Sequence, residues 1–456
     1  GLFATLSLAE AGVPVTLLEK GKAVEDRGRD IGAMFVRRKL DPNSNLCYGE
    51  GGAGTWSDGK LTTRIGKNSA RVRQVLEALV HFGAPERILV DGKPHVGTDR
   101  LVKILRNLRS HLRALGAEIR FGASVAEVLT RDGRVAGVRL ADGEVMEADQ
   151  VVLAVGHSAR HLYEHLLDIG VTLVPKDFAL GFRVEHPQAV INRIQYGEAF
   201  AALVDEGSKR GAGALPVADY RLAVEVPNKN NVDAKPSPVF SFCMCPGGQV
   251  VPTSTQEDEL CVNGMSFSKR GSKWANSALV VGVECNQLAA LADGWEDMPM
   301  RAGREALVGV QFQQKAEQRA AIMGGGKLVA PVQTVPAFLD GVQSKQPLPS
   351  SSYRLGVRSA RLDLLYPAPI TESLREALRN FDRRMPGFVC EDALLHGVET
   401  RTSAPVCIER GQDLECVSLR GLYPCGEGAG YAGGIVSAAV DGLQIASAVA
   451  RAYAQQ

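Results

Sequence analysis

The segment Gly426-Glu427-Gly428-Ala429-Gly430-Tyr431-Ala432-Gly433-Gly434 decides the fold. It follows a short apolar run, 421–425, and precedes a long apolar run predicted to be a helix from Ile435 to about Ala452. Its letters from Gly428 to Gly433 read G-x-G-x-x-G, and a glycine turn that opens a helix presents unpaired N–H groups and a positive dipole end. Such a turn suits a pyrophosphate or a flavin edge that becomes anionic on reduction. A turn that needs glycine only for packing is the alternative.

The start of the chain has a pattern that complements the glycine turn near its end. Apolar residues of 2–9 fall on one helical face, Gly12 can end that helix, and 13–18 is a buried strand that ends at Glu19. A helix and a strand closed by an acid form the second half of a dinucleotide-binding βαβ unit, in which the acid binds the adenosine ribose. Gly1 then takes the place of the third glycine, and we expect the sequence to be a fragment without its first strand. An ordinary amphipathic helix followed by a buried strand is the alternative.

Two further segments belong with these ends. Residues 49–61 are glycine-rich and from Gly54 nearly match a Walker A loop, but Leu61 stands where magnesium needs a hydroxyl, so we reject an ATPase. The apolar run 150–155 ends at Gly156 and reads as a buried parallel strand. Before it, three short strands are predicted at 124–129, 135–140 and 144–148, joined by two Asp-Gly turns.

This order of motifs resembles the glutathione-reductase type of flavoprotein, which binds FAD in an extended form across a Rossmann-like sheet. More closely, the chain is similar, nearly end to end, to an uncharacterised family of FAD-dependent dehydrogenases from bacteria and plastid-bearing organisms. The segments that carry this similarity are 28–32, 49–60, 241–248 and 424–435. The resemblance is specific for fold and cofactor and gives little about the substrate.

The resemblance implies a set of cofactor-binding residues. Gly1 would belong to the pyrophosphate turn, Glu19 would bind the ribose beside Lys20, and Val125 would offer backbone to the adenine. The full set is Gly1, Glu19, Lys20, Gly51, Gly52, Gly54, Ser57, Val125, Gly156, Glu427, Gly428, Gly434 and Ile435. One departure is that many relatives of the wider class carry Gly-Asp where this chain has Gly426-Glu427, whose acidic side chain is longer by one methylene.

The middle of the chain lacks a second dinucleotide fingerprint, which argues against a separate nicotinamide domain. Strand-like runs at 179–185, 239–243 and 278–283 alternate with helical patterns near 302–322 and 371–384. We therefore predict an α/β protein whose Rossmann-like FAD-binding domain is formed by both chain ends, with an inserted α+β substrate domain. The predicted boundaries are 1–175, 176–395 and 396–456.

Three groups of polar residues in or near this middle region are candidates for a redox, a metal-binding or an RNA-binding role. Cys243 and Cys245 are two apart in a predicted strand, which would turn both thiols to one side, as a redox pair or as buried free cysteines. His161 to His165 spells H-x-x-E-H, a zinc motif without a third ligand, so packed or solvated histidines are favoured and no metal is predicted. Five basic residues on the predicted helix 98–115 favour a solvated face over an RNA surface.

The composition of the chain limits the kinds of partner that it can bind. The chain has 456 residues, 49 of them glycine, and a net charge of +1, so no global field attracts nucleic acid or an anionic membrane. Nine cysteines without metal-type spacing suit a reducing compartment, the cytoplasm or the plastid stroma. The best apolar candidate for a membrane span, 428–440, is short and rich in glycine, so we predict a soluble protein.

The predicted function is an FAD-dependent oxidoreductase that transfers hydride or electrons through its flavin. Cys245 and Arg401 are the predicted catalytic residues, and Arg183, His186 and the segment 399–403 are further candidates for substrate contact. The partners would be a small-molecule substrate and NAD(P)H as a possible diffusible donor. An FAD-dependent RNA-modifying enzyme and a zinc hydrolase are the rival classes.

Overall fold

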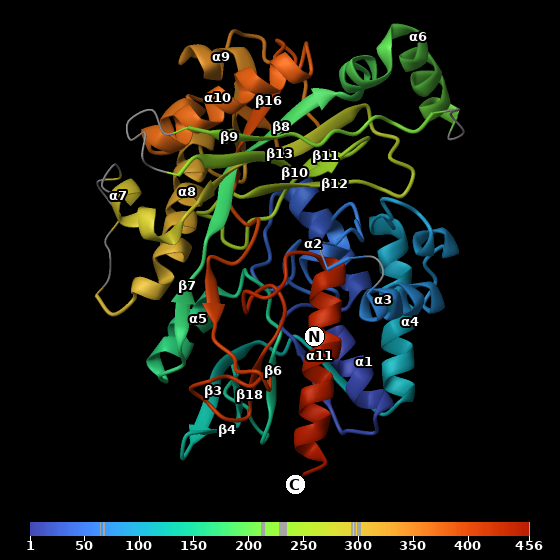
Figure 1. Cartoon of the computed structure of the whole chain (residues 1–456), viewed down its shortest axis with the longest axis vertical. Helices are drawn as coiled ribbons and strands as arrows, with labels where there is room; N and C mark the ends of the chain where they lie inside the picture. Colours follow the sequence, from blue (N-terminus) through green and yellow to red (C-terminus); the bar gives the residue numbers. More distant parts are fainter. Residues whose placement is uncertain are drawn as a thin grey trace.

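A computed structural model shows an α/β protein in which helices cover several β-sheets (Figure 1). The structure describes residues 1–63, 65–66, 69–210 (205–210 as backbone only), 215–227, 235–292, 295, 298 and 302–455.

The two ends of the chain pack together. Helices α1 (Leu2–Glu10) and α11 (Ile435–Tyr453) lie side by side in Figure 1, and a Cβ added to Gly442 of α11 would lie 3.2 Å from the backbone nitrogen of Ala4 in α1. Small residues at this contact let the two helix backbones approach closely. Helices α3 (Ala70–His81) and α4 (Thr98–Ala114) complete this layer and share its apolar core with α11. The two ends of the chain are therefore in contact.

The strands below these helices are parallel. Strand β1 (Thr16–Glu19) pairs in parallel with β2 (Glu118–Phe121), and β6 (Val151–Leu153) pairs in parallel with β18 (Leu422–Pro424). They form two pairs, and Gly1 lies between the pairs, since its added Cβ would lie 3.8 Å from Leu17 and 3.7 Å from Ala154. The N-terminal half thus meets the C-terminal strand through β6 and Gly1.

A three-stranded meander covers these pairs. It consists of β3 (Val125–Arg131), β4 (Arg134–Leu140) and β5 (Val145–Glu147), close to the predicted strands. At the β3–β4 turn Asp132 and Gly133 have φ angles of 52° and 72°, as a type I′ hairpin requires. The Asp-Gly signal therefore predicted this turn correctly.

A seven-stranded, largely antiparallel sheet forms the upper half of the molecule in Figure 1. Its order is β15 (Val357–Ser359), β14 (Ala330–Thr334), β16 (Leu394–Glu399), β8 (Phe178–Pro187), β13 (Trp274–Val283), β10 (Ser237–Cys245) and β9 (Ala223–Val226). Helices α8 (Val308–Gly324) and α10 (Ala368–Arg384) cover one face and share the largest apolar core with it. The hairpin of β11 (Gln249–Pro252) and β12 (Val262–Met265) packs against the same sheet.

The alternation along β8 explains its two faces. Phe178, Leu180, Phe182 and Val184 belong to the large core, while residues between them, such as Arg183, point to the other face. Apolar residues on one face of an antiparallel strand drive its packing, and the opposite face is free for polar side chains.

The remaining elements lie within these two regions or between them. These are α2 (Val24–Arg37), η1 (Ala53–Trp56), η2 (Glu86–Leu89), α5 (Arg160–Asp168), β7 (Leu173–Pro175), α6 (Gln188–Arg210), η3 (Cys285–Gln287), α7 (Leu288–Ala292), η4 (Glu305–Leu307), α9 (Val335–Asp340), η5 (Leu362–Leu364) and β17 (Val406–Ile408).

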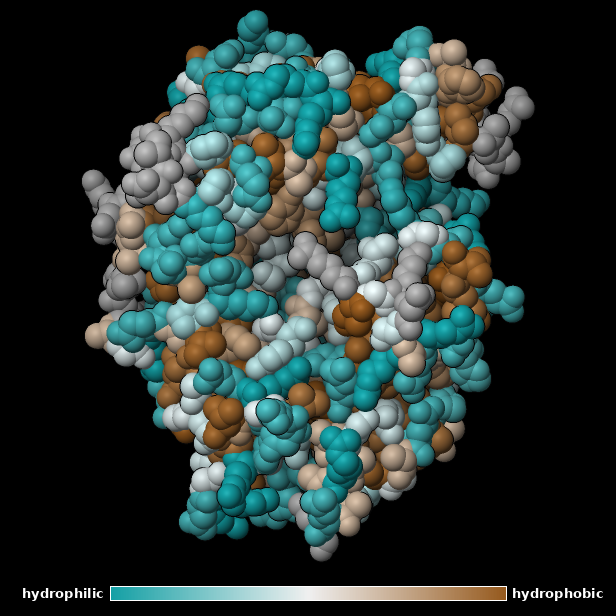
Figure 2. Space-filling view, in the orientation of Figure 1, coloured by the Kyte–Doolittle hydropathy of each residue, from teal (hydrophilic) through white to brown (hydrophobic). Residues whose placement is uncertain are grey.

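Helix α11 is apolar enough, by length and composition, to cross a membrane, with a mean hydropathy of 1.3. However, 56% of this stretch is buried inside the protein, where it packs on α1 and α3. The face drawn in Figure 2 interleaves hydrophilic and hydrophobic residues, as in a soluble globular protein. Helix α11 is thus a core helix.

Candidate cofactor and substrate site

The carboxyl ends of β1, β6 and β18 lie near Gly1. Strand β1 ends at Glu19, β6 is followed by Gly156, and β18 is followed by the turn at Gly426. In open α/β sheets a ligand binds beyond the carboxyl ends of parallel strands, where the helices that follow present their N-termini. The structure therefore brings together the segments that the sequence predicted to form one site.

One carboxylate oxygen of Glu19 accepts hydrogen bonds from two backbone segments. Its Oε1 accepts hydrogen bonds from the N–H groups of Gly21 at 2.8 Å and Gly49 at 2.9 Å. A Cβ on Gly21 would lie 2.5 Å from the backbone of Gly49, so both positions need close backbone approach.

The glycine turn at Gly428 packs against Gly156, in the segment that follows β6, without room for a side chain. A Cβ there would lie 2.3 Å from the carbonyl oxygen of Gly156, and Tyr163 donates a hydrogen bond of 2.8 Å to the carbonyl of Gly428. At Gly52, Gly156 and Gly433 nothing lies within 4 Å of an added Cβ. The glycines of these segments thus combine tight backbone packing at Gly428 with open space beside the backbone at the other three positions.

Helix α11 begins at this open space. Gly433 and Gly434 are exposed, and no side chain caps the helix at Gly434. The first intrahelical bond runs from the N–H of Ala438 to the carbonyl of Gly434, so the N–H groups of the first turn remain for a ligand. A Cβ on Gly54 would lie 3.0 Å from Ile435, which places the glycine-rich loop at the start of this helix.

The other predicted cofactor residues lie around the same segments. Ser57 donates a 2.7 Å hydrogen bond to the carbonyl of Gly54, Lys20 lies 4.3 Å from the ring centre of Tyr48, and Glu427 lies 3.4 Å from His157. Val125 begins β3, and its carbonyl lies 3.4 Å from Nε2 of His161. A Cβ on Gly51 would collide with Thr55 at 2.2 Å. Glu427 thus belongs to the glycine turn and also has His157 as a side-chain partner.

The second face of the seven-stranded sheet combines small apolar and polar residues. Ala179, Ala278 and Val280 form a separate buried cluster, against which the half-buried Phe240 and Phe242 pack. Beneath them Arg183 is fully buried, and its Nη1 lies 2.7 Å from Oε2 of Glu399. Burial favours the neutral form of this carboxyl and raises the pKa of Glu399 despite the arginine.

The structure corrects the prediction that Cys243 and Cys245 face one side. Both lie in β10, as predicted, but a register shift between Phe242 and Cys245 interrupts the alternation, and Cys243 has a φ of 47°. Cys243 is therefore exposed, whereas Cys245 is 1% exposed and lies 3.6 Å from Nη2 of Arg183. Burial raises the pKa of the Cys245 thiol, so this thiol is protonated at neutral pH.

Arg401 lies in a buried ion-pair cluster. Its Nη2 lies 2.6 Å from Oε2 of Glu317 and 3.2 Å from Glu259, and its Nη1 donates to Ser158 and Thr255. Only 3% of its side chain is exposed. The geometry is that of an ion pair between the two regions, and the prediction that Arg401 is catalytic gains no support from it. The same holds for Cys245, because its thiol is buried.

His186, a predicted substrate contact, lies on the other face of β8 from Arg183. Its Nε2 lies 2.8 Å from the carbonyl of Phe388, and burial lowers its pKa to about 4. Because successive residues of a strand alternate, His186 and Arg183 do not share a site. Within the segment 399–403, Thr402 is half-buried and donates to the carbonyl of Ala179 at 2.6 Å.

The H-x-x-E-H residues lie on α5, where both histidines turn to the backbone of β3. The N–H of Val128 donates to Nε2 of His165 at 2.8 Å, and Glu164 lies 3.0 Å from Arg304. Among the described residues, no group of three potential ligands is placed to hold a metal. On α4, Arg109 lies 2.6 Å from Glu25 and 2.8 Å from Glu50, so part of the basic face is neutralised.

Sequence reasoning missed the contact between the glycine-rich loop and the upper sheet. Asp58 is buried, accepts a hydrogen bond from Ser266 and lies 2.7 Å from Arg270 and 3.6 Å from Lys60. Lys60 in turn donates to the carbonyl of Met244, next to Cys243. No sequence signal marks this contact, because its partners are about 200 residues apart.

Comparison with known proteins identifies the class. The family model "Flavin containing amine oxidoreductase" matches residues 33–204, and the model "FAD-dependent protein, C-terminal domain-like" matches 177–402. Both describe proteins that use FAD, and together they span most of the chain.

An uncharacterised protein of Clostridium beijerinckii is 40% identical over 447 residues, which are 98% of this chain and 78% of that protein. The chain belongs to the same family as this clostridial protein. A zeta-carotene-forming phytoene desaturase of Myxococcus xanthus is 29% identical over 117 residues, 23% of this chain and 22% of the desaturase. The solved structure of CtdE in complex with FAD is 12% identical with a TM-score of 0.33, covering 99% of this chain and 81% of CtdE. The protein is an FAD-dependent oxidoreductase.

Proposed function

We propose that the protein binds FAD in an extended form, in the manner of glutathione-reductase-type flavoproteins, across a Rossmann-like layer built by both chain ends. The observation that carries this proposal is that Gly156 and Gly428 meet beyond the carboxyl ends of β6 and β18, while Gly1 lies between β6 and β1, the strand that ends at Glu19. The predicted division into 1–175, 176–395 and 396–456 is part of it. The family match to residues 177–402 supports that division.

Each group in the site has a defined task. Glu19 holds the ribose, the loop that carries Gly52 and Gly54 follows the pyrophosphate, and the N–H groups at the start of α11 stabilise negative charge on the reduced ring. The FAD supplies the hydride or electron transfer, and the protein supplies position and electrostatics.

The substrate lies, in this proposal, against the second face of the upper sheet. The half-buried rings of Phe240 and Phe242 offer an apolar surface, and the exposed Cys243 lies at its end. Arg183 acts as a positioning residue, because it donates a 2.7 Å hydrogen bond to the carbonyl of Cys243 and so holds the irregular part of β10. NAD(P)H is the proposed diffusible donor.

The proposed compartment is reducing, the cytoplasm or the plastid stroma, because all nine cysteines are free. The alternative function, RNA modification, depended on the basic face of α4, and the pairing of Arg109 with Glu25 and Glu50 weakens it.

The first test is spectroscopic. The purified protein should absorb at about 450 nm, and anaerobic NADH or NADPH should bleach this band if either is the donor. Glu19→Gln should weaken FAD binding by about tenfold or more, because an acceptor becomes a donor at the ribose. Glu10→Gln, at an exposed position on α1, is the control and should leave binding unchanged. A colourless protein that takes up no added FAD contradicts the proposal.

A further inference from the structure

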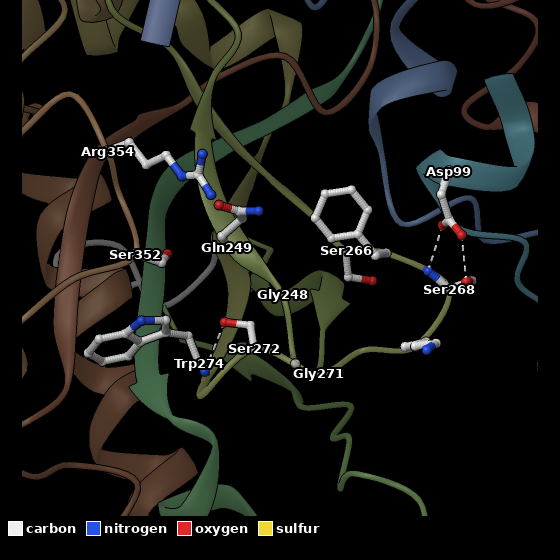
Figure 3. Close-up of a pocket in the computed structure, with 13 residues that line it drawn as sticks. Asp99, Gly248, Gln249, Ser266, Ser268, Gly271, Ser272, Trp274, Ser352 and Arg354 are labelled. Atoms are coloured by element: carbon white, nitrogen blue, oxygen red, sulfur yellow. Dashed lines mark hydrogen bonds between the residues drawn. The ribbon is translucent and has the colours of Figure 1, made fainter. Parts of the chain in front are cut away.

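A cavity of about 660 Å³ lies beside the contact between α4 and the upper sheet, apart from the cofactor residues (Figure 3). Its volume is that of a site for a ligand of nucleotide or drug size. None of the predicted FAD-binding residues lines it. The lining includes Gln249, Ser266, Phe267, Lys269, Trp274 and Arg354.

The charged groups of the cavity favour an anion. Lys269 and Arg354 are exposed, and neither has a carboxylate partner among the residues that the structure describes. Asp99 is the acid in the lining, and its two oxygens already accept hydrogen bonds of 2.8 and 2.7 Å from the N–H and hydroxyl of Ser268. The lining thus carries two cations against one hydrogen-bonded carboxylate, and this net positive charge suits a phosphate group.

The remaining lining fits a nucleoside. Phe267 is 48% exposed, and an exposed aromatic ring offers a face on which a base can stack. Figure 3 shows the guanidinium of Arg354 and the side chain of Gln249 directed toward each other, with Ser266 across the cavity and Trp274 at its base. An amide and hydroxyl groups are suitable partners for sugar hydroxyls.

We propose that this cavity is a second nucleotide site, which binds a nucleoside phosphate with its base on Phe267 and its phosphate on Arg354 and Lys269. The site is connected to the cofactor loop, because Ser266 lines the cavity and donates a hydrogen bond to Asp58 of that loop. The proposal does not depend on the substrate of the flavin.

The test measures AMP binding by calorimetry to protein saturated with FAD, so that AMP cannot occupy the adenosine part of the cofactor site. Adenosine and inorganic phosphate are separate probes. Arg354→Gln should weaken AMP binding at least tenfold. Arg358→Gln, which removes an exposed arginine outside the cavity, should not change it. Phe267→Ala should weaken AMP and adenosine about tenfold and leave phosphate binding unchanged.

Three outcomes overturn the proposal. The first is no AMP binding at millimolar concentration to the FAD-saturated protein. The second is equal AMP affinity of the Arg354→Gln and Arg358→Gln proteins. The third is phosphate binding as tight as that of AMP, which would leave an anion site without a nucleoside. The flavin absorbance of each variant shows separately whether FAD binding persists, so failure here is distinct from failure of the proposed cofactor site.

Discussion

Gly428 shows why a single residue type is required at the cofactor turn. Its backbone lies so close to β6 that a methyl group would meet the carbonyl oxygen of Gly156 at 2.3 Å. We expect Gly428→Ala to lower the free energy of unfolding by about 1–3 kcal/mol, through overpacking against backbone, and to weaken FAD binding. Urea unfolding and flavin retention measure the two effects.

Gly32 provides the matched control. It is exposed within α2, and nothing lies within 4 Å of an added Cβ. Gly32→Ala should therefore raise stability by about 0.5–1 kcal/mol through helix propensity alone. If Gly428→Ala proved as harmless, the close packing of the turn on β6 would be wrong.

Arg401 is a second residue whose role depends on burial. Glu317 is fully buried and lies 2.6 Å from Arg401 and 2.8 Å from Arg160. Loss of one partner from a buried pair leaves an uncompensated charge, so Arg401→Gln should cost about 3–5 kcal/mol in urea unfolding. Arg73→Gln, which breaks an exposed pair with Glu77, should change stability by no more than about 0.5 kcal/mol. A stable Arg401→Gln protein that binds FAD but is inactive would instead favour the predicted catalytic role.

At the scale of helices and strands, the sequence correctly predicted those elements whose formation depends on a local pattern of residues. The glycine turn followed by α11 and the Asp-Gly hairpin of β3 and β4 are present as expected, because glycine positions and apolar periodicity are local signals. The orientation of Cys243 could not be predicted, because strand alternation fails where β10 shifts register against β13. That shift depends on a partner strand more than 30 residues away.

The ion-pair cluster around Glu317, which joins α5, α8 and two loops, makes the stability of the protein depend on pH. Burial, and then the charge of Glu317, raises the pKa of Glu259 to about 7. The folded state therefore binds more protons than the unfolded chain between the ordinary carboxyl pKa and pH 7, and stability falls as pH rises through this window. The arginines hold the pKa of Glu317 well below its usual range, so Glu317 stays charged there.

Glu259→Gln isolates this contribution. The amide keeps an acceptor for Arg401 and cannot ionise, so the variant should lose less stability than the wild type between pH 5 and pH 8, by at most about 3 kcal/mol. Thermal unfolding across this pH range measures the difference. The exposed Glu257→Gln change should leave the pH profile as it is. Parallel profiles for Glu259→Gln and the wild type would show that Glu259 titrates normally.

At the scale of the whole molecule, the candidate site is assembled from segments that lie far apart in the sequence. The cofactor side could be predicted from sequence patterns, whereas the substrate side could not. Each cofactor segment has its own glycine signature, so the two ends could be assigned to one ligand before their contact was known. The polar contact of Asp58 with Ser266 and Arg270 could not be assigned, because a lone aspartate and a lone serine carry no pattern. Function on the cofactor side was therefore predictable, while the substrate side depends on tertiary contacts.

Two separate ligand sites in one molecule should contribute to stability independently. A ligand present at 100 times its Kd stabilises the folded state by about 2.7 kcal/mol, and increments from separate sites add. We expect FAD to raise the melting temperature of the protein and AMP to raise it again when FAD is saturating. Arg354→Gln should lose the AMP increment and keep that of FAD, whereas Glu19→Gln should diminish the FAD increment and keep that of AMP. If both variants lost both increments, AMP and FAD would share one site, and the cavity beside α4 would have no ligand of its own.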